Sequence, residues 1–169
     1  MATELLLGLP ALYIGMTIVL IGIVMMGKAA AKDLSYFILL TGIISAAVAI
    51  YNWLDVGLPL LTAQTLLFAF TYLWTFGNWF TGATDTRAEG WYCLLVVFAG
   101  IPFTIWTFQS GYNILGVNWI TWLVAWFAFW VVMGLQKPQA IKPTIAICFV
   151  VGSFLFINAL AWLLGWWGF

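Results

Sequence analysis

Six long apolar runs, separated by short polar breaks, make up nearly the whole chain. Each run is close to the roughly 20 residues that an α-helix needs to cross a hydrocarbon core of about 30 Å. None shows the alternation of polar and apolar positions that a membrane β-barrel strand requires. The pattern therefore predicts an all-α polytopic membrane protein that forms a helical bundle. It places the spans at about 5–27, 34–54, 58–80, 90–110, 117–135 and 143–167, within one transmembrane domain of residues 1–169.

Every basic residue lies in an alternate break of this pattern. If each run crosses the membrane once, three breaks on one side hold Lys28, Lys32, Arg87, Lys137 and Lys142. Short cytoplasmic loops retain Lys and Arg, so these breaks are predicted to be inside. A multi-pass protein of the cytoplasmic membrane, with both termini extracytoplasmic, follows from this placement.

Composition narrows the chemistry. The chain is 66% hydrophobic and 6% charged, with a mean hydropathy of +1.13 and a net charge of zero. No basic stripe is present that could neutralise phosphates, so nucleic acid is not an expected partner. The chain has no histidine, and Cys93 and Cys148 lie far apart in apolar runs, so we expect neither a metal site nor a cofactor.

The predicted spans contain no internal carboxylate, lysine or histidine. Proton-coupled and ion-coupled transporters usually place such a group near the membrane midplane. Serine and threonine at membrane depth also have no base beside them, so the chain is not expected to be an enzyme. The remaining neutral polarity suits a path for a neutral solute, and it comes from Thr71, Tyr72, Asn78, Asn118, Thr121 and Asn158.

The fifth predicted span carries a tryptophan stripe. Trp119, Trp122, Trp126 and Trp130 are spaced three, four and four residues apart, which places four indoles along one helical face. Flat aromatic faces can hold a planar urea or amide group by shape. Packing against neighbouring helices explains the same spacing equally well, and periodicity alone does not separate the two.

A second stripe consists of glycine. Gly8, Gly15 and Gly22 recur every seven residues along the first span, which allows another backbone to approach closely. The stripe is predicted to serve packing. It could face another helix of the same chain or a neighbouring protomer.

Several segments together resemble the bacterial urea and short-chain amide channel family, also called the AmiS/UreI family. The run Leu66 to Trp74, LLFAFTYLW, carries the resemblance most specifically. Supporting segments are Gly8-Leu9 with Leu12 to Gly15, Asn78, Gly90 to Leu94, Asn118-Trp119 with Trp122 and Trp126, and Ala161 to Leu164.

The resemblance implies a six-helix protomer with its own pore, assembled with other copies into a homohexamer. It also implies a pore narrowed at two levels by aromatic and aliphatic side chains. Carried over position by position, the pore-lining residues are Ile14, Ile18, Phe68, Tyr72, Trp119, Trp122, Trp126, Phe129 and Trp130.

The chain departs from the acid-gated members of that family in two ways. Those members carry histidines on long outer loops, whereas this chain has short outer connections and no histidine. A glutamate of their last span is replaced here, near Gly152 and Ser153, by small residues. The chain is therefore more similar to the amide-associated branch. We expect a passive channel for urea or short aliphatic amides without a proton gate; the alternative is a non-conducting membrane assembly subunit.

Overall fold

The computed structural model describes residues 2–166, with side chains described from Gly8 onward. Six long helices confirm the predicted all-α class, and each is long and apolar enough to cross a membrane. Their bounds are α1 Ala2–Met25, α2 Ala31–Leu54, α3 Pro59–Thr81, α4 Arg87–Gln109, α5 Asn113–Phe129 and α6 Ile141–Leu163. A π-helical segment, η1 Trp130–Gly134, continues α5, and a short 3₁₀ turn, η2 Pro138–Ala140, precedes α6.

The helices form a closed ring. Each one packs against the next along the chain, and α6 returns to α1. The pairs α1–α6 and α2–α3 pack most extensively, whereas the seam between α3 and α4 is the thinnest of the ring. This arrangement leaves a central space bordered mainly by the odd-numbered helices, which all run in one direction.

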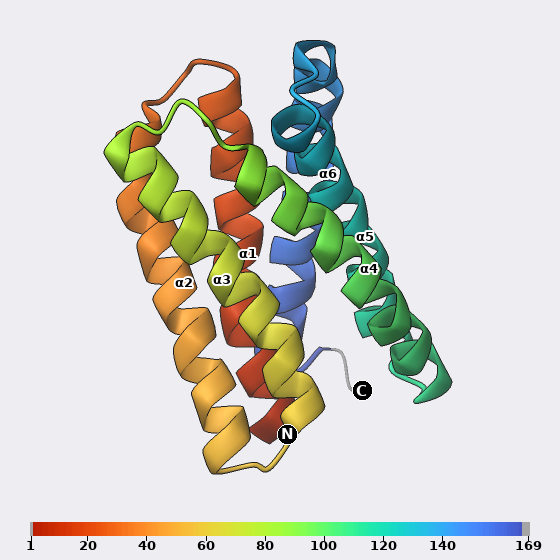
Figure 1. The fold of residues 1–169 in the computed structure, drawn as a ribbon. Helices are drawn as coiled ribbons and strands as arrows, with labels where there is room; N and C mark the ends of the chain where they lie inside the picture. Colours follow the sequence, from red (N-terminus) through yellow and green to blue (C-terminus); the bar gives the residue numbers. More distant parts are fainter. Residues whose placement is uncertain (1, 167–169) are drawn as a thin grey trace.

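The connections between helices lie at two ends of the ring (Figure 1). The three loops that carry the basic residues, which follow α1, α3 and α5, lie together at one end, here called the basic end. The start of α1 and the end of α6 lie at the opposite end, here called the terminal end. This is the alternation that the charge pattern predicted.

Single hydrogen bonds join several neighbouring helices inside the ring. The hydroxyls of Thr17 and Thr41 lie 2.8 Å apart between α1 and α2, and the Tyr92 hydroxyl donates to the carbonyl of Leu67 between α4 and α3 at 2.9 Å. Many threonine and serine hydroxyls bond to the carbonyl one turn earlier in their own helix, as Thr107 does to Phe103 at 2.7 Å. These hydroxyl groups thus have partners without water, which a lipid environment favours.

The glycine stripe of α1 faces α6 of the same chain. A Cβ added at Gly8 would meet Leu163, and one added at Gly22 would meet Cys148. At Gly15 the contact is backbone to backbone, because an added Cβ would lie 2.6 Å from the Phe156 nitrogen and 2.9 Å from the Gly152 oxygen. The question left open by the sequence is therefore answered: the stripe closes the helix ring.

Substituting Gly15→Ala should destabilise the protein by about 1 to 3 kcal/mol, because backbone atoms of α6 cannot move aside as a flexible side chain can. Gly77→Ala in α3 is the matched control, because a Cβ added at Gly77 would meet no atom within 4 Å. We would compare thermal unfolding in detergent for both variants and the parent. Equal stability of the two variants would show that the α1–α6 crossing tolerates separation.

Candidate functional site

Two cavities lie in the centre of the ring, one after the other. The basic-end cavity has a volume of about 50 Å³, and the terminal-end cavity has a volume of about 30 Å³. Phe68 of α3 and Trp122 of α5 line both cavities, so these two rings lie where one cavity gives way to the other. A single water molecule needs roughly 10 to 15 Å³ of such cavity volume, so each cavity holds only a few water-sized groups.

Aromatic rings close the space between the cavities. The Phe68 ring lies 4.6 Å from that of Trp122 and 4.7 Å from that of Trp126, between ring centroids. Trp119 completes this aromatic cluster, 5.9 Å from Phe68 and 5.2 Å from Trp122. All four side chains are buried, and their tilted and edge-on contacts are the favourable geometries for aromatic pairs.

A hydrogen bond fixes one indole of the cluster, and the other two indoles have no hydrogen-bond partner in the described part of the chain. The Trp126 indole donates to the Thr71 hydroxyl at 3.3 Å, and Thr71 itself donates to the Leu67 carbonyl. The indole nitrogens of Trp119 and Trp122 are buried and have no partner among the residues that the structure describes. An orphaned N–H inside a dry bundle costs free energy, which a bound carbonyl or hydroxyl oxygen would recover.

The structure places most of the predicted lining residues around these cavities. Ile18, Tyr72, Trp126 and Phe129 line the basic-end cavity, and Ile14 and Trp119 line the terminal-end cavity, in addition to the shared Phe68 and Trp122. Whether these side chains contact a moving solute stays a prediction.

Trp130 lies apart from that set and lines neither of the two cavities. It is the first residue of the π-helical segment, and its ring lies 5.9 Å from Trp91 of α4 and 5.2 Å from Phe127. The backbone N–H of Trp130 still bonds to the Trp126 carbonyl, so Trp130 follows Trp126 with α-helical spacing. It packs against Trp91 of α4 instead of lining a cavity.

Five of the six neutral polar residues that the sequence singled out divide into two groups, and the sixth, Asn78, bonds to Glu89. Thr71 and Tyr72 line the basic-end cavity. Asn118 and Asn158 instead bond to each other at 2.7 Å between α5 and α6, where both are buried, and Thr121 bonds to the carbonyl of Asn118. The asparagine pair joins two helices of the ring.

Glu89 corrects the expectation that the bundle interior holds no carboxylate. Helix α4 begins at Arg87, three residues before the Gly90 that the pattern predicted, and Glu89 is only 2% exposed. It accepts hydrogen bonds from the Thr75 hydroxyl and, at 2.7 Å, from the Asn78 amide, and it lines the basic-end cavity. A hydropathy pattern treats a carboxylate as a group that needs water. Here the Thr75 and Asn78 side chains of α3 take the place of that water.

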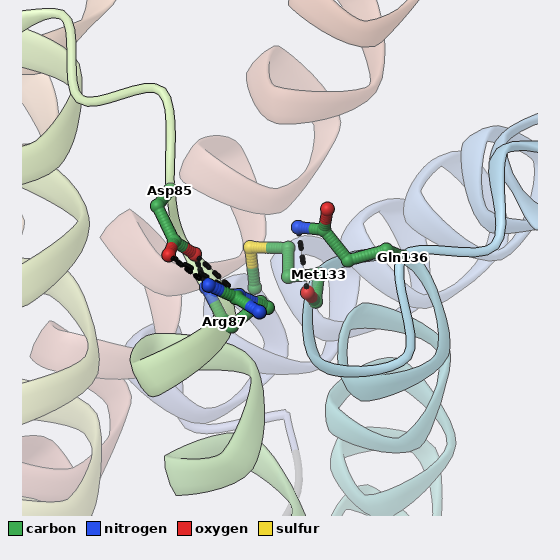
Figure 2. Close-up of polar contacts among 4 residues, drawn as sticks. All are labelled: Asp85, Arg87, Met133 and Gln136. Atoms are coloured by element: carbon green, nitrogen blue, oxygen red, sulfur yellow. Dashed lines mark hydrogen bonds and ion pairs between the residues drawn. The ribbon is translucent and has the colours of Figure 1, made fainter.

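Two polar contacts lie near the basic end, one between Asp85 and Arg87 and one between Met133 and Gln136 (Figure 2). Asp85 and Arg87 form an exposed ion pair with an oxygen to nitrogen distance of 2.6 Å. Hydrogen bonds from Arg87 lower the pKa of Asp85 to about 2, so this carboxylate stays ionised at any physiological pH. Met133 of η1 lines the basic-end cavity, and its carbonyl accepts a long hydrogen bond from Gln136 in the following turn.

Fold and cavities together define a class of protein: a six-helix membrane bundle with an aromatic-lined interior. The model of the AmiS/UreI family transporters matches residues 6–166, and the chain belongs to this family. The family assignment made from the sequence segments is thereby confirmed.

Individual relatives agree with the family. The chain is 27% identical over 145 residues to a candidate amidate substrates transporter protein of Mycolicibacterium smegmatis, covering 82% of this chain. It is 26% identical over 138 residues to the candidate transporter protein AmiS2 of Rhodococcus erythropolis, covering 79% of this chain. In both cases the match spans 66% of the relative's own length.

Two solved structures share the fold. A cryo-electron microscopy structure of the Helicobacter pylori urea channel in a closed state superposes with a TM-score of 0.83, covering 96% of this chain and 100% of that one at 24% identity. A crystal structure of the urea channel from the same organism gives a TM-score of 0.80 over 96% and 99% of the two chains, also at 24% identity. The fold of this chain is therefore the fold of those channels.

Proposed function

We propose that the protein is a passive channel for urea or short aliphatic amides, and that residues 1–169 act as one channel domain. The observation that carries the proposal is the pair of small cavities in line through the helix ring, separated by the aromatic cluster of Phe68, Trp119, Trp122 and Trp126. Cavities that hold a few water-sized groups suit solutes of four or five heavy atoms. The family membership and the names of the relatives support the same solute class.

The electrostatics of the interior favour a neutral solute over an ion. Most lining atoms belong to aromatic and aliphatic side chains, with Thr71, Thr75 and Glu89 on one side. An ion would lose its hydration without a ring of carbonyls or charges to replace it, whereas a planar amide loses only a few hydrogen bonds. Nothing in this arrangement requires a catalytic step, which agrees with a family of transporters.

The competing proposal, a non-conducting assembly subunit, rested on the glycine and tryptophan stripes acting between proteins. The glycines are used inside the chain, against α6, and Trp119, Trp122 and Trp126 are buried in the ring interior. Neither stripe is free to bind a neighbouring subunit. This observation favours conduction.

Assembly and orientation complete the proposal. The family resemblance supports a homohexamer in the cytoplasmic membrane, and each copy has its own internal cavities, so conduction needs no residue from a neighbour. The positive-inside rule supports a cytoplasmic basic end and extracytoplasmic termini.

Purified protein in liposomes should raise urea and acetamide permeation above that of empty liposomes. The Trp126→Ala variant should have a wider constriction at the aromatic cluster and lower selectivity for urea over butyramide. The reason is that Trp126 lines the basic-end cavity and packs against Phe68. Trp130→Ala is the matched tryptophan control, since Trp130 lines neither cavity.

Stopped-flow light scattering would measure both permeabilities, with size exclusion as the check of assembly. No flux in the parent protein would overturn the channel itself. Equal selectivity in well-assembled Trp126→Ala and parent protein would instead show that the solute path avoids the aromatic cluster. A buried tryptophan truncated to alanine costs about 3 to 5 kcal/mol, so a loss of assembled Trp126→Ala protein is a separate outcome that size exclusion detects.

Orientation can be tested with fusions. An enzyme reporter that is active only in the cytoplasm should be silent after Phe169 and active when inserted between Gly82 and Asp85, because the second position lies in a loop of the basic end. The paired insertion controls for expression. The reverse pattern would invert the proposed topology.

External acid should not open the channel. The chain has no histidine, and Asp85, whose lowered pKa keeps it ionised until the pH approaches about 2, lies at the basic end. We expect the rate of urea uptake by expressing cells with a buffered interior to change by less than about twofold between external pH of about 7.5 and about 5. A rise of about tenfold or more would show an external proton sensor.

A further inference from the structure

Glu89 is the one ionisable carboxylate that the described structure places in the lining of either cavity. It occupies the first turn of α4 and is 2% exposed. No Lys or Arg forms an ion pair with it among the described residues, where the recorded pair is Asp85 with Arg87. A charged group inside a membrane bundle is costly to keep, so its presence points to a function rather than to packing.

The two hydrogen bonds to Glu89 leave part of its capacity unused. Thr75 donates to Oε1 and Asn78 donates to Oε2, and both donors lie on one face of α3, three residues apart. The two oxygens of the Glu89 carboxyl group offer more acceptor sites than these two hydrogen bonds occupy. The cavity lining around it is mostly apolar and includes the Tyr72 hydroxyl, but among the described residues the side chains that donate to Glu89 are those of Thr75 and Asn78. A molecule within the cavity can use the remaining acceptor sites.

Unused hydrogen-bond donors, in contrast to the unused acceptor sites of Glu89, lie toward the terminal-end cavity. The side-chain amide nitrogen of Gln64, a residue that is 3% exposed and lines the terminal-end cavity, has no hydrogen-bond partner in the described structure. The indole N–H of Trp122, which borders both cavities, has none either. Unused donors therefore lie at the terminal end and at the aromatic cluster, and unused acceptors lie at the basic end.

We propose that Glu89 is a specificity-determining residue of the proposed channel, and this inference rests on that proposed function. Gln64 and then Trp122 donate to the carbonyl oxygen of a solute on its way through, and Glu89 accepts hydrogen bonds from the N–H groups of the solute once it has passed the aromatic cluster. A solute with both a carbonyl and an unsubstituted NH₂ group satisfies each of these positions in turn. An N-alkylated amide of equal size offers fewer N–H groups to Glu89 and is disfavoured.

Isomers separate this inference from simple size selection. Propionamide and N-methylacetamide have the same formula and nearly the same skeleton, but the second has one N–H group where the first has two. Liposomes containing the parent protein should conduct propionamide faster, after subtraction of the empty-liposome rate. Glu89→Gln should lower the ratio of propionamide to N-methylacetamide permeation by roughly tenfold or bring it to one. Thr75 and Asn78 would then compete for a single carbonyl oxygen, which leaves less acceptor capacity for the N–H groups of the solute.

Asp85→Asn is the matched control, since it removes an equal charge four residues earlier from an exposed position that lines neither cavity. It should keep the parent ratio. Thermal unfolding and size exclusion would establish that each variant is folded.

The outcomes are distinguishable. Parent protein that conducts neither isomer, urea nor acetamide overturns the proposed channel function. Parent protein that conducts both isomers equally overturns the role of Glu89 even if Glu89→Gln does not fold. Parent protein that prefers propionamide, with an unchanged ratio in folded Glu89→Gln, also overturns it.

Discussion

The close approach of α1 and α6 is the constraint on which the rest of the molecule depends. Six helices in chain order make an open row until the last packs against the first, and only a closed ring has an interior. Gly15 and Gly152 allow that closure, because their backbones meet where no side chain would fit. Thr17 with Thr41, and Asn118 with Asn158, then bind neighbouring helices around the ring. In lipid, where apolar surfaces gain little from meeting each other, such contacts carry the association.

A second close approach shapes the basic end of the interior. A Cβ at Gly90 of α4 would lie 2.2 Å from the Gly134 nitrogen of the π-helical segment, so Gly90 must be glycine for the two backbones to meet, whereas a Cβ at Gly134 would lie 2.6 Å from the Trp130 ring. This contact fixes the first turn of α4 beside η1 and therefore sets the position of Glu89, the residue before Gly90. The thin α3–α4 seam is joined at the same level by Thr75 and Asn78. Backbone packing and polar contacts thus act together at this site.

The sequence predicted the parts of the structure that lipid dictates. Long apolar runs gave six helices because no other element satisfies its backbone within a membrane, and the alternation of Lys and Arg gave the two ends. Helical spacing placed Trp119, Trp122 and Trp126 on one face, and the structure turns that face inward. Trp130 keeps the α-helical spacing from Trp126 but packs against Trp91 of α4 instead of lining a cavity, a contact that spacing along one helix cannot predict.

Glu89 was missed for a related reason. A hydropathy pattern treats a carboxylate beside an apolar run as a boundary, since it cannot register partners from another helix. The available signal was the presence of Thr75 and Asn78 three residues apart near the end of the preceding run, where two donors share one face. Only the packing of α3 against α4 shows that these donors meet Glu89.

The aromatic cluster between the cavities also bears on the energetics of the whole cell. Protons move through water by hopping along an unbroken chain of hydrogen-bonded molecules, and Phe68 with Trp122 interrupts that chain. In the proposed channel, a planar solute between the rings would fill the gap itself, so no continuous column of water would form while it passed. A channel of that kind would keep the membrane permeable to a small neutral nitrogen source while preserving the electrical and proton gradients that drive ATP synthesis.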